Sequence, residues 1–443
     1  MKNTIASISG IRGVFNENLF QSDIVRYVGN FASLVPGKRV LVGRDTRSTG
    51  DVISRTVCGA LLGRGVAVVD YGVLSTPALF RESRTRKIPA VMITASHNEP
   101  EWNGLKFIVD GRGIVQPELE RILAPGKRSG TRGAKSLPEE PTGTLVLGPA
   151  PSYNSELVTM AGEGSADGVK VVIDVNGGAA VYHAPAILEK LDCQLSVLGG
   201  TPGLFSRMVD PTSDGLQLLS QTVKEKCADV GFAFDCDGDR LVLVDADGRK
   251  RTGDYMLTLA FKELLPNVTN RSVVVSVDTT QAIDEVVSEL GGTVFRSKVG
   301  EANVISKMNE TGARLGGEGS SGGLIDSEFN YCRDSMLAAI GIVTAVKKKG
   351  TKAFDRVRSY SQVRLKLVME RRKALVAIKK LSKEHPEAGS LDGLKIDLAG
   401  RSWVLVRPSG TEDVVRISAE AASEKEADEA ARSFLNAVKR LGA

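Results

Sequence analysis

Polar side chains follow a short apolar run near residue 90. The stretch PAVMITASHNEPEWNGLKF (89–107) passes from aliphatic residues to Ser96, His97 and Asn98. In parallel α/β sheets, ligands bind where strands end. Ser96 is therefore a candidate nucleophile, with Lys106 as a nearby candidate cation. The alternative is that Ser96 caps the next helix, a common role for serine.

Three aspartates alternate with other residues after a second apolar run. In FAFDCDGDRLVLVD, Asp235, Asp237 and Asp239 occupy every second position. Carboxylates this close repel one another unless a cation lies among them, and oxygen-only ligands favour Mg²⁺, Mn²⁺ or Ca²⁺ over zinc. An EF-hand loop requires Gly sixth and Glu twelfth, whereas Arg240 and Ala246 stand there, so that motif is excluded. A solvated acidic turn is the remaining alternative.

A glycine-rich loop, GEGSSGG (317–323), carries one charge, that of Glu318. Its glycines permit close approach of the backbone to a ligand, although a plain tight turn has the same composition. Its first six residues have GxGxxG spacing, a weak signal on its own, but no phosphate-binding P-loop motif occurs in the chain. The absence of a P-loop argues against a nucleotide as the phosphoryl donor.

A fourth loop, within VLVRPSGTEDVVRI, is suited to a phosphate. It contains Arg407, Ser409, Gly410 and Thr411 within five residues. A guanidinium group binds phosphate with two parallel hydrogen bonds, and hydroxyls and backbone amides add neutral donors. A β-turn with an incidental arginine is the alternative. With no P-loop present, the four loops together predict that the serine itself carries a phosphoryl group.

The composition limits the classes of protein to which the chain belongs. Of its 443 residues, 42% are hydrophobic and 25% charged, and 58 basic residues face 53 acidic ones, which gives a net charge of +5. This excess is too small to predict a nucleic-acid partner. Five scattered cysteines predict reduced thiols and a cytoplasmic location. With no apolar run of about 18 residues, no membrane span is expected.

Short apolar runs alternate with amphipathic ones. RVLVGRD (39–45), VAVVDYG (66–72) and 89–96 are typical of buried strands, and 51–65 of a helix, which predicts parallel sheets covered by helices. Residues 124–143, rich in Gly, Pro, Ser and charge, predict an exposed loop near a domain boundary. Near the end, 363–387 is helix-prone, 403–421 is hairpin-like and 423–442 predicts a closing helix.

The joint pattern resembles the α-D-phosphohexomutase superfamily. TASHN is similar to its phosphoserine loop, DCDGDR to its metal loop, GEGSSGG to its sugar loop and RPSGTE to its phosphate loop. SGIRG near the start and GRDTRSTG (43–50) also match, and the motifs follow the family order along the whole chain. The resemblance implies three similar α/β domains and a smaller C-terminal α+β domain around a central cleft. The expected boundaries are 1–148, 149–249, 250–352 and 353–443.

The resemblance also implies a mechanism and a set of site residues. Ser96 should carry a phosphoryl group that passes to a hexose 6-phosphate, giving a hexose 1,6-bisphosphate and then the 1-phosphate. Mg²⁺ is the implied cofactor, held by Ser96, Asp235, Asp237 and Asp239. The implied catalytic residues are Ser96, Arg12, His97, Lys106 and Arg240. The implied substrate-binding residues are Glu318, Ser320, Ser321, Lys298, Arg407, Ser409, Gly410 and Thr411.

This sequence departs from the family pattern in its sugar loop. Gly323 stands where many relatives have a histidine, and the loop is one residue longer, which leaves open whether Ser320 or Ser321 takes the polar position. Such a glycine pair resembles archaeal-type members. Glu99 and Asp413 replace the usual prolines, as tolerable loop changes.

No motif distinguishes substrates at C2 of the sugar. Glucosamine phosphate is the favoured substrate, with mannose and glucose phosphates as alternatives. Two other classes stay open: a metal-dependent phosphatase with Asp235 as nucleophile, and a non-catalytic sugar-phosphate sensor. A monomer and a homodimer are both compatible with the sequence.

Overall fold

The computed structural model describes residues 4–35, 37–125, 144–148, 151–409 and 413–442. The predicted exposed loop at 124–143 therefore lies almost wholly outside the described residues. By its contacts the chain divides into two compact units. The first contains residues 1–256 and 321–354, and the second contains 257–320 and 355–443.

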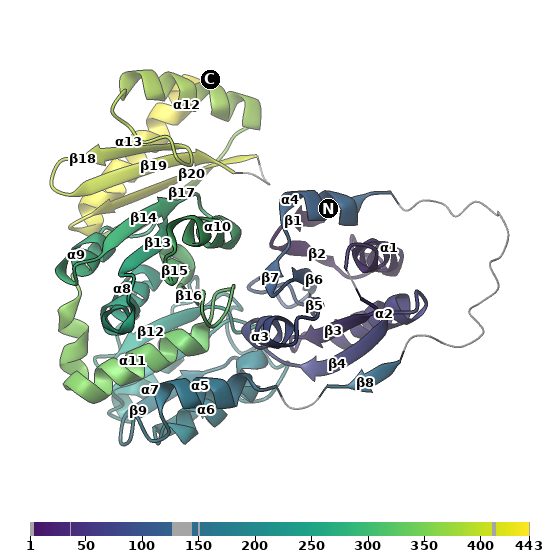
Figure 1. Ribbon diagram of the computed structural model, residues 1–443. Helices are drawn as coiled ribbons and strands as arrows, with labels where there is room; N and C mark the ends of the chain where they lie inside the picture. The colour runs from purple at the N-terminus through teal and green to yellow at the C-terminus, as the bar shows by residue number, and fades with distance from the viewer. Residues whose placement is uncertain (1–3, 36, 126–143, 149–150, 410–412, 443) are drawn as a thin grey trace. The chain divides into compact units, whose positions relative to one another are not determined.

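A mixed sheet forms the first part of the first unit (Figure 1). Its strand order is β1 (Ile5–Ser7), β2 (Gly10–Val14), β6 (Trp102–Val109), β5 (Ala90–Ile93), β3 (Arg39–Arg44), β4 (Ala67–Val73) and β8 (Leu145–Leu147), with β7 (Arg112–Gly113) beside β6. Its helices are α1 (Gln21–Ala32), α2 (Gly50–Leu62), α3 (Thr76–Arg86) and α4 (Gln116–Leu123). An apolar core joins α1, α2 and α4 to the sheet.

The predicted strands and helix of this region are confirmed, but the sheet is not wholly parallel. Strands β3, β4 and β5 are parallel neighbours, whereas β6 runs antiparallel to β5. The chain returns from β5 to β6 through a short loop with no helix. Since a parallel connection needs a crossover of a dozen or more residues, the short loop that carries Ser96 enforces the antiparallel pairing.

A second sheet completes the first unit. Its order is β10 (Gln194–Leu198), β9 (Lys170–Asp174), β11 (Val230–Phe234) and β12 (Leu241–Asp245), with β12 antiparallel to β11. Its short helical segments are α5 (Tyr153–Ala161), η1 (Ala179–Tyr182), α6 (Ala184–Lys190) and α7 (Gln217–Glu225). Strand β16 (Gly323–Asp326) and helix α11 (Ser335–Lys349) also belong to this unit.

The second unit contains two further sheets. In one, β13 (Ser272–Ser276) pairs in parallel with β14 (Thr293–Ser297) and β15 (Leu315–Glu318), and the helices are α9 (Ala282–Glu289) and α10 (Glu301–Thr311). Helix α8 (Gly253–Leu264) and segment η4 (Gly350–Arg356) span the unit boundaries. Segment η2 (Leu265–Asn267) follows α8, and η3 (Gly319–Ser321) follows β15. The other sheet is antiparallel, in the order β17 (Ser361–Val368), β20 (Val414–Ala421), β19 (Ser402–Pro408) and β18 (Leu394–Leu398).

Helices α12 (Arg371–Glu384) and α13 (Glu424–Gly442) share an apolar core with this last sheet. The predicted closing helix and the hairpin of β19 and β20 are confirmed. The helix expected over 363–387 is wrong in its first part, where β17 forms instead. Alternate side chains of β17 are more buried, and pairing with β20 along its length outweighs the local preference of its lysine and leucine residues.

Among the described helices, none combines the length and the apolar composition needed to cross a lipid bilayer. All five cysteines are free thiols, and only Cys227 is exposed.

His183 is a buried histidine that serves the fold of the first unit. Its Nε2 accepts a hydrogen bond from the Ser75 amide at 3.1 Å, and its Nδ1 lies 2.7 Å from Oδ1 of Asn154. The ring is therefore neutral, with the proton on Nδ1. Burial lowers its pKa to about 4.

This histidine makes the stability of the protein dependent on pH. The unfolded chain takes up a proton near pH 6.5, whereas the folded chain does so only near pH 4, so stability falls as the pH drops through this window. Between pH 7 and pH 5 we expect a loss of roughly 2 kcal/mol in the free energy of unfolding. Urea unfolding of wild type and His183→Gln measures it. The glutamine variant should lose that part of the pH dependence, and equal slopes would contradict the assignment.

Candidate functional site

Ser96 lies in the loop that joins β5 to β6. Its backbone is left-handed, with φ of 51°, an uncommon conformation for a serine. The side chain is buried, and its Oγ donates to Oδ2 of Asp235 at 3.2 Å. Nδ1 of His97 is 3.5 Å from the same Oγ. The structure thus brings the predicted nucleophile to the aspartate loop, 139 residues further along the chain.

The aspartate loop connects β11 to β12. Asp235, Asp237 and Asp239 are all buried, and one carboxylate oxygen from each lies within 4.8 Å of the others. Gly238, with φ of 69°, supplies the left-handed turn that brings Asp239 back toward Asp235. Oδ1 of Asp235 accepts from the amides of Asp239 and Arg240 at 3.1 and 3.2 Å. The alternative of a solvated acidic turn is therefore excluded.

Basic side chains surround these carboxylates. Nζ of Lys106 is 2.7 Å from Asp237 Oδ2 and 3.1 Å from Asp239 Oδ2. Nε of Arg240 lies 3.9 Å from both Asp235 and Asp239. Arg240 Nη1 pairs with Asp210, a residue that the sequence had not indicated.

Arg12 and His97 complete this cationic surround. Arg12, on β2, donates to Oδ1 of Asn98 at 3.1 Å, and burial lowers its pKa to about 10. Burial and the nearby charges of Arg240 and Arg12 lower the pKa of His97, so its ring is neutral. The predicted residues Arg12, Ser96, His97, Lys106 and Arg240 therefore meet at one place in the first unit.

The three aspartates fit a hard divalent cation. Oδ1 of Asp237 and Oδ1 of Asp239 are buried and have no hydrogen-bond partner among the described residues. Burial and the two neighbouring carboxylates raise the pKa of Asp235. Although burial opposes it, the charges of Arg333, Lys106 and Arg240 hold the pKa of Asp239 low. Orphaned carboxylate oxygens are costly unless a cation binds them, so this loop has the donor set that Mg²⁺ prefers.

Two further residues hold the aspartate loop. Thr76, at the start of α3, donates its hydroxyl to Oδ2 of Asp237 at 2.5 Å. Nη2 of Arg333 is 2.9 Å from Oδ2 of Asp239, and its Nη1 donates to Oγ of Ser321 at 3.2 Å. Arg333 thus links the glycine-rich loop to the aspartate loop. Sequence reasoning missed it, although it directly precedes the cap of an apolar helix, at Asp334.

The Arg333 side chain explains the glycine at 323. A Cβ built on Gly323 would lie 2.2 Å from Cδ of Arg333 and 2.6 Å from its Cγ. A side chain at 323 and the observed position of Arg333 are therefore mutually exclusive. The guanidinium reaches Asp239 across the space that a larger residue at 323 would fill.

Two of the predicted substrate-binding residues, Glu318 and Arg407, lie in the second unit, where one turn connects them. The amide of Gly300 donates to Oε1 of Glu318 at 2.7 Å, and the amide of Val299 donates to Oδ2 of Asp392 at 3.0 Å. The same Asp392 oxygen accepts from Nη1 of Arg407 at 2.9 Å. The turn after β14 thus joins the predicted sugar-binding carboxylate to the predicted phosphate-binding arginine.

Other members of the predicted substrate set are less constrained. Lys298 is exposed beside this turn, and Ser320 is half-buried. Ser409 is buried, with its amide bonded to the Val414 carbonyl at 2.8 Å. Nε of Arg407 is buried without a partner among the described residues. Gly410 and Thr411 lie outside the described residues.

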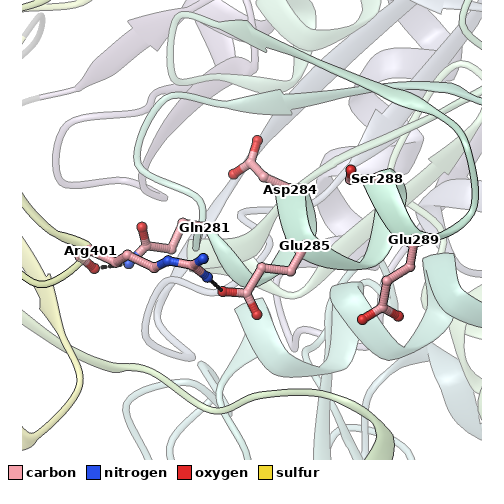
Figure 2. Close-up of a pocket in the computed structure, with 6 residues that line it drawn as sticks. All are labelled: Gln281, Asp284, Glu285, Ser288, Glu289 and Arg401. Carbon is pink, nitrogen blue, oxygen red and sulfur yellow. Dashed lines mark hydrogen bonds and ion pairs between the residues drawn. The ribbon is translucent and has the colours of Figure 1, made fainter.

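A separate surface hollow in the second unit lacks these features (Figure 2). Its lining residues are Gln281, Asp284, Glu285, Ser288, Glu289 and Arg401. Glu285 pairs with Arg401, Asp284 with Arg296, and Glu289 with Lys262. Its acidic groups already have basic partners, so the hollow is not a candidate site.

Comparisons with known proteins agree with this geometry. Four sequence families match in chain order, all described as phosphoglucomutase/phosphomannomutase: α/β/α domain I over 4–129, domain II over 152–248, domain III over 252–363 and the C-terminal domain over 364–437. The chain belongs to the phosphoglucomutase/phosphomannomutase family. The fold class predicted from the sequence is confirmed.

Relatives of similar length match along nearly the whole chain. A probable phosphoglucosamine mutase of Methanopyrus kandleri is 33% identical, over 98% of this chain and 97% of the relative. One of Thermococcus kodakarensis is also 33% identical, over 95% of both chains. Among solved structures, a phosphoglucomutase/phosphomannomutase family protein of Burkholderia thailandensis is 25% identical, with a TM-score of 0.84, and the match covers 99% and 97% of the two chains.

For this family member, the packing of Arg333 on Gly323 gives a testable prediction. In Gly323→Ala the new methyl group should displace Arg333 and break its contacts with Asp239 and Ser321. A hydrogen bond to a charged group contributes about 1.5–3 kcal/mol, so hexose-phosphate turnover should fall about 10- to 100-fold. The fall should be no larger in the double variant with Arg333→Ala, because both changes remove the same contacts.

Gly59→Ala is the matched control for this change. Gly59 lies in α2 with open space where a methyl group would be added. This variant should keep full turnover and gain a little stability. Full turnover in Gly323→Ala as well would show that Arg333 has no part in the site.

Proposed function

We propose that the protein interconverts hexose 6-phosphates and hexose 1-phosphates through a phosphoserine at Ser96. The observation that carries the proposal is the position of Ser96 Oγ, 3.2 Å from Asp235 at a buried loop of three carboxylates. No P-loop motif occurs in the chain, which supports a phosphoryl group that resides on the protein itself. The family match gives the same reaction class.

Charge balance supports a phosphorylated Ser96. A phosphoserine carries about −1.5 to −2, so with three carboxylates the local charge approaches about −5. Arg12, Lys106, Arg240 and Arg333 supply four opposing positive charges. A bound Mg²⁺ would neutralise further charge on the phosphoryl oxygens.

The transfer proceeds in two halves. In the first, O1 of a hexose 6-phosphate attacks the phosphorus, the bond from phosphorus to Ser96 Oγ breaks, and its electron pair returns to Oγ. The O1 proton passes to the freed Oγ, and Lys106 and Arg12 are proposed to assist this proton transfer. The 1,6-bisphosphate then turns end for end. In the second half, Ser96 Oγ takes the former 6-phosphoryl group, and the sugar O6 regains a proton.

We assign the second unit the task of holding the rest of the substrate. Arg407 and Ser409, with Gly410 and Thr411, would bind the phosphate that is not being transferred. Glu318 and a serine of the glycine-rich loop would hold sugar hydroxyls, and Lys298 is an additional cation. Arg407 already uses Nη1 to contact Asp392, which leaves Nε on its other edge as the donor toward a phosphate.

Glucosamine phosphate is the proposed preferred substrate. The relatives cited above are named probable phosphoglucosamine mutases. Glu318 is buried and fixed by Gly300, and its negative charge favours an ammonium group on the sugar. Glucose and mannose phosphates are the alternatives within the class. The family match gives no support to the phosphatase alternative, and Asp235 is held by two amides and by Ser96.

Turnover of the three hexose phosphates, by wild type and by Glu318→Gln, tests the substrate assignment. The variant removes a charge–charge interaction only for the amino sugar. A charge-assisted hydrogen bond exceeds a neutral one by about 1 kcal/mol, so kcat/KM for glucosamine phosphate should fall about fivefold more than for glucose phosphate. Equal losses would remove the basis for preferring glucosamine. No turnover of any hexose phosphate by wild type would contradict the mutase itself.

The domain boundaries at 148/149, 249/250 and 352/353 and the cytoplasmic location stay predictions. Both the monomer and the homodimer stay open.

A further inference from the structure

The motif GRDTRSTG has no role in the reaction described above, yet it contains one of the largest fully buried side chains. Arg47 lies just after β3, and its guanidinium group has no exposed surface. A buried guanidinium is costly unless its five N–H donors have partners. The partners of this one all lie close to Ser96.

Four carbonyl groups of the Ser96 loop accept hydrogen bonds from Arg47. Nη2 donates to the carbonyls of Ser96 and Asn98 at 2.6 and 2.7 Å. Nη1 donates to the carbonyls of Glu99 and Trp102, the latter at 2.9 Å. These four residues extend from Ser96 to Trp102, over most of the turn between β5 and β6. The fifth donor, Nε, bonds to Oδ2 of Asp45 at 3.1 Å.

Asp45 and Thr94 complete a ring of contacts around the loop. Oδ2 of Asp45 accepts from the Thr94 hydroxyl at 2.6 Å, and its Oδ1 accepts from the Arg47 amide at 3.1 Å. Oγ1 of Thr94 in turn accepts from the amide of Ser96 at 2.8 Å. The Ser96 backbone is thus held at both its amide and its carbonyl. None of these contacts involves the reactive Oγ.

We infer that Arg47, supported by Asp45 and Thr94, is a positioning residue that fixes the left-handed backbone of Ser96 and so keeps its Oγ at the aspartate loop. The inference rests on the proposed function. The phosphoryl group on Ser96 appears and disappears in each reaction cycle, which changes the local charge by about −2. A loop held through backbone carbonyls by a buried fixed charge keeps its geometry through that change.

Lysine cannot replace this arginine. An ammonium group has three donors around one point, whereas the guanidinium plane reaches four carbonyls and a carboxylate at once. Arg47→Lys should therefore release part of the loop while keeping the charge. A displacement of about 1 Å at a reacting group costs about 100-fold in rate.

The experiment compares wild type, Arg47→Lys, Thr94→Val and a control, Arg81→Lys. Arg81 also pairs with a carboxylate, Glu156, and donates to a carbonyl, that of Phe329, but it makes none of the contacts of the Ser96 loop. Each protein is treated with glucose 1,6-bisphosphate, and phosphate on Ser96 is quantified by mass spectrometry. Transfer from the phosphoserine to glucosamine 6-phosphate is then followed by rapid quench, per phosphorylated site. Hydrogen exchange is measured over residues 94–104.

We expect the transfer rate to fall about 100-fold in Arg47→Lys and about tenfold in Thr94→Val, with KM within about twofold of wild type. Exchange over 94–104 should rise in both variants. Arg81→Lys should keep the wild-type rate per site, even if its melting temperature falls. A purely structural role would lower stability and leave the rate per phosphorylated site unchanged.

A wild-type rate per site in Arg47→Lys would overturn the inference. If that variant does not fold, a wild-type rate in Thr94→Val has the same meaning. If wild type takes up no phosphate at Ser96, the proposed function fails. Hydrogen exchange over residues 94–104 then tests the positioning role by itself. Unchanged exchange in the variants would overturn that role, and increased exchange would support it.

Discussion

Replacing Ser96 with alanine should abolish steady-state hexose-phosphate turnover, with a loss of about 10⁴-fold or more. Removal of a covalent nucleophile leaves only binding and electrostatic contributions to the rate. The fold should persist, because the hydrogen bonds of the Oγ are long, at 3.2 Å to Asp235 and 3.5 Å to Nδ1 of His97. Alanine at this position also has to adopt a φ of 51°, which is unfavourable for any residue with a Cβ.

Ser96→Gly separates the effect of losing the hydroxyl group from the effect of backbone strain. Glycine adopts a positive φ without strain, so this variant lacks the Oγ but has no steric penalty. Both variants should be inactive if the hydroxyl is the phosphoryl carrier. Incubation of wild type with ³²P-labelled glucose 1,6-bisphosphate and peptide mapping locates the label. Label on Asp235 in place of Ser96, or activity in Ser96→Gly, would contradict the mechanism.

The parts of the site that lie within one loop could be predicted from the sequence. Ser96 and His97 lie within four residues of the end of β5, and the three aspartates begin directly after β11. Local apolar runs are therefore enough to place them at strand ends. Their meeting depends on long-range packing, because Ser96 and Asp235 are 139 positions apart in the chain. The order of the family motifs made that meeting predictable. The resemblance implied that the serine loop and the aspartate loop belong to one site, which local sequence patterns do not show.

Residues that act across sequence distance were missed. Arg333 reaches Asp239 from 94 positions away, and Arg47 reaches Ser96 from 49 positions away. Arg333 has no distinctive local pattern, since an arginine beside an aspartate is common on any surface. Arg47 lies in the GRDTRSTG motif, but the motif alone does not indicate what the arginine contacts. Their burial alone distinguishes them, and burial depends on how separate elements pack.

The two errors of fold have the same cause. The sequence pattern predicted a parallel sheet, and β6 is antiparallel because the connection before it is short. The arginine, lysine and leucine residues of β17 have helical preference, and the segment becomes a strand because β20 offers eight residues of pairing. In both cases a neighbouring strand decides the structure, and the local sequence carries little information about that neighbour.

Asp237→Asn should weaken Mg²⁺ binding and turnover together. Oδ2 of Asp237 is held by Lys106 and Thr76, so the orphaned Oδ1 is the atom positioned to bind a cation. The asparagine keeps the size of the side chain and removes its charge. Loss of even a supporting partner of a metal site costs about 10- to 100-fold in metal affinity, so loss of a ligand charge should cost at least this much.

Titration calorimetry with Mg²⁺, and electron paramagnetic resonance with Mn²⁺, measure affinity without reference to activity. Asp247→Asn is the control, because Asp247 is exposed at the far end of β12 and pairs with Arg249. It should bind the cation as wild type does. EDTA should inactivate wild type and Mg²⁺ should restore it, because without the cation three buried carboxylates and a phosphoserine repel one another. Full activity after exhaustive EDTA dialysis would show that Lys106, Arg240 and Arg333 alone neutralise the loop, and the three-aspartate metal site would then be wrong.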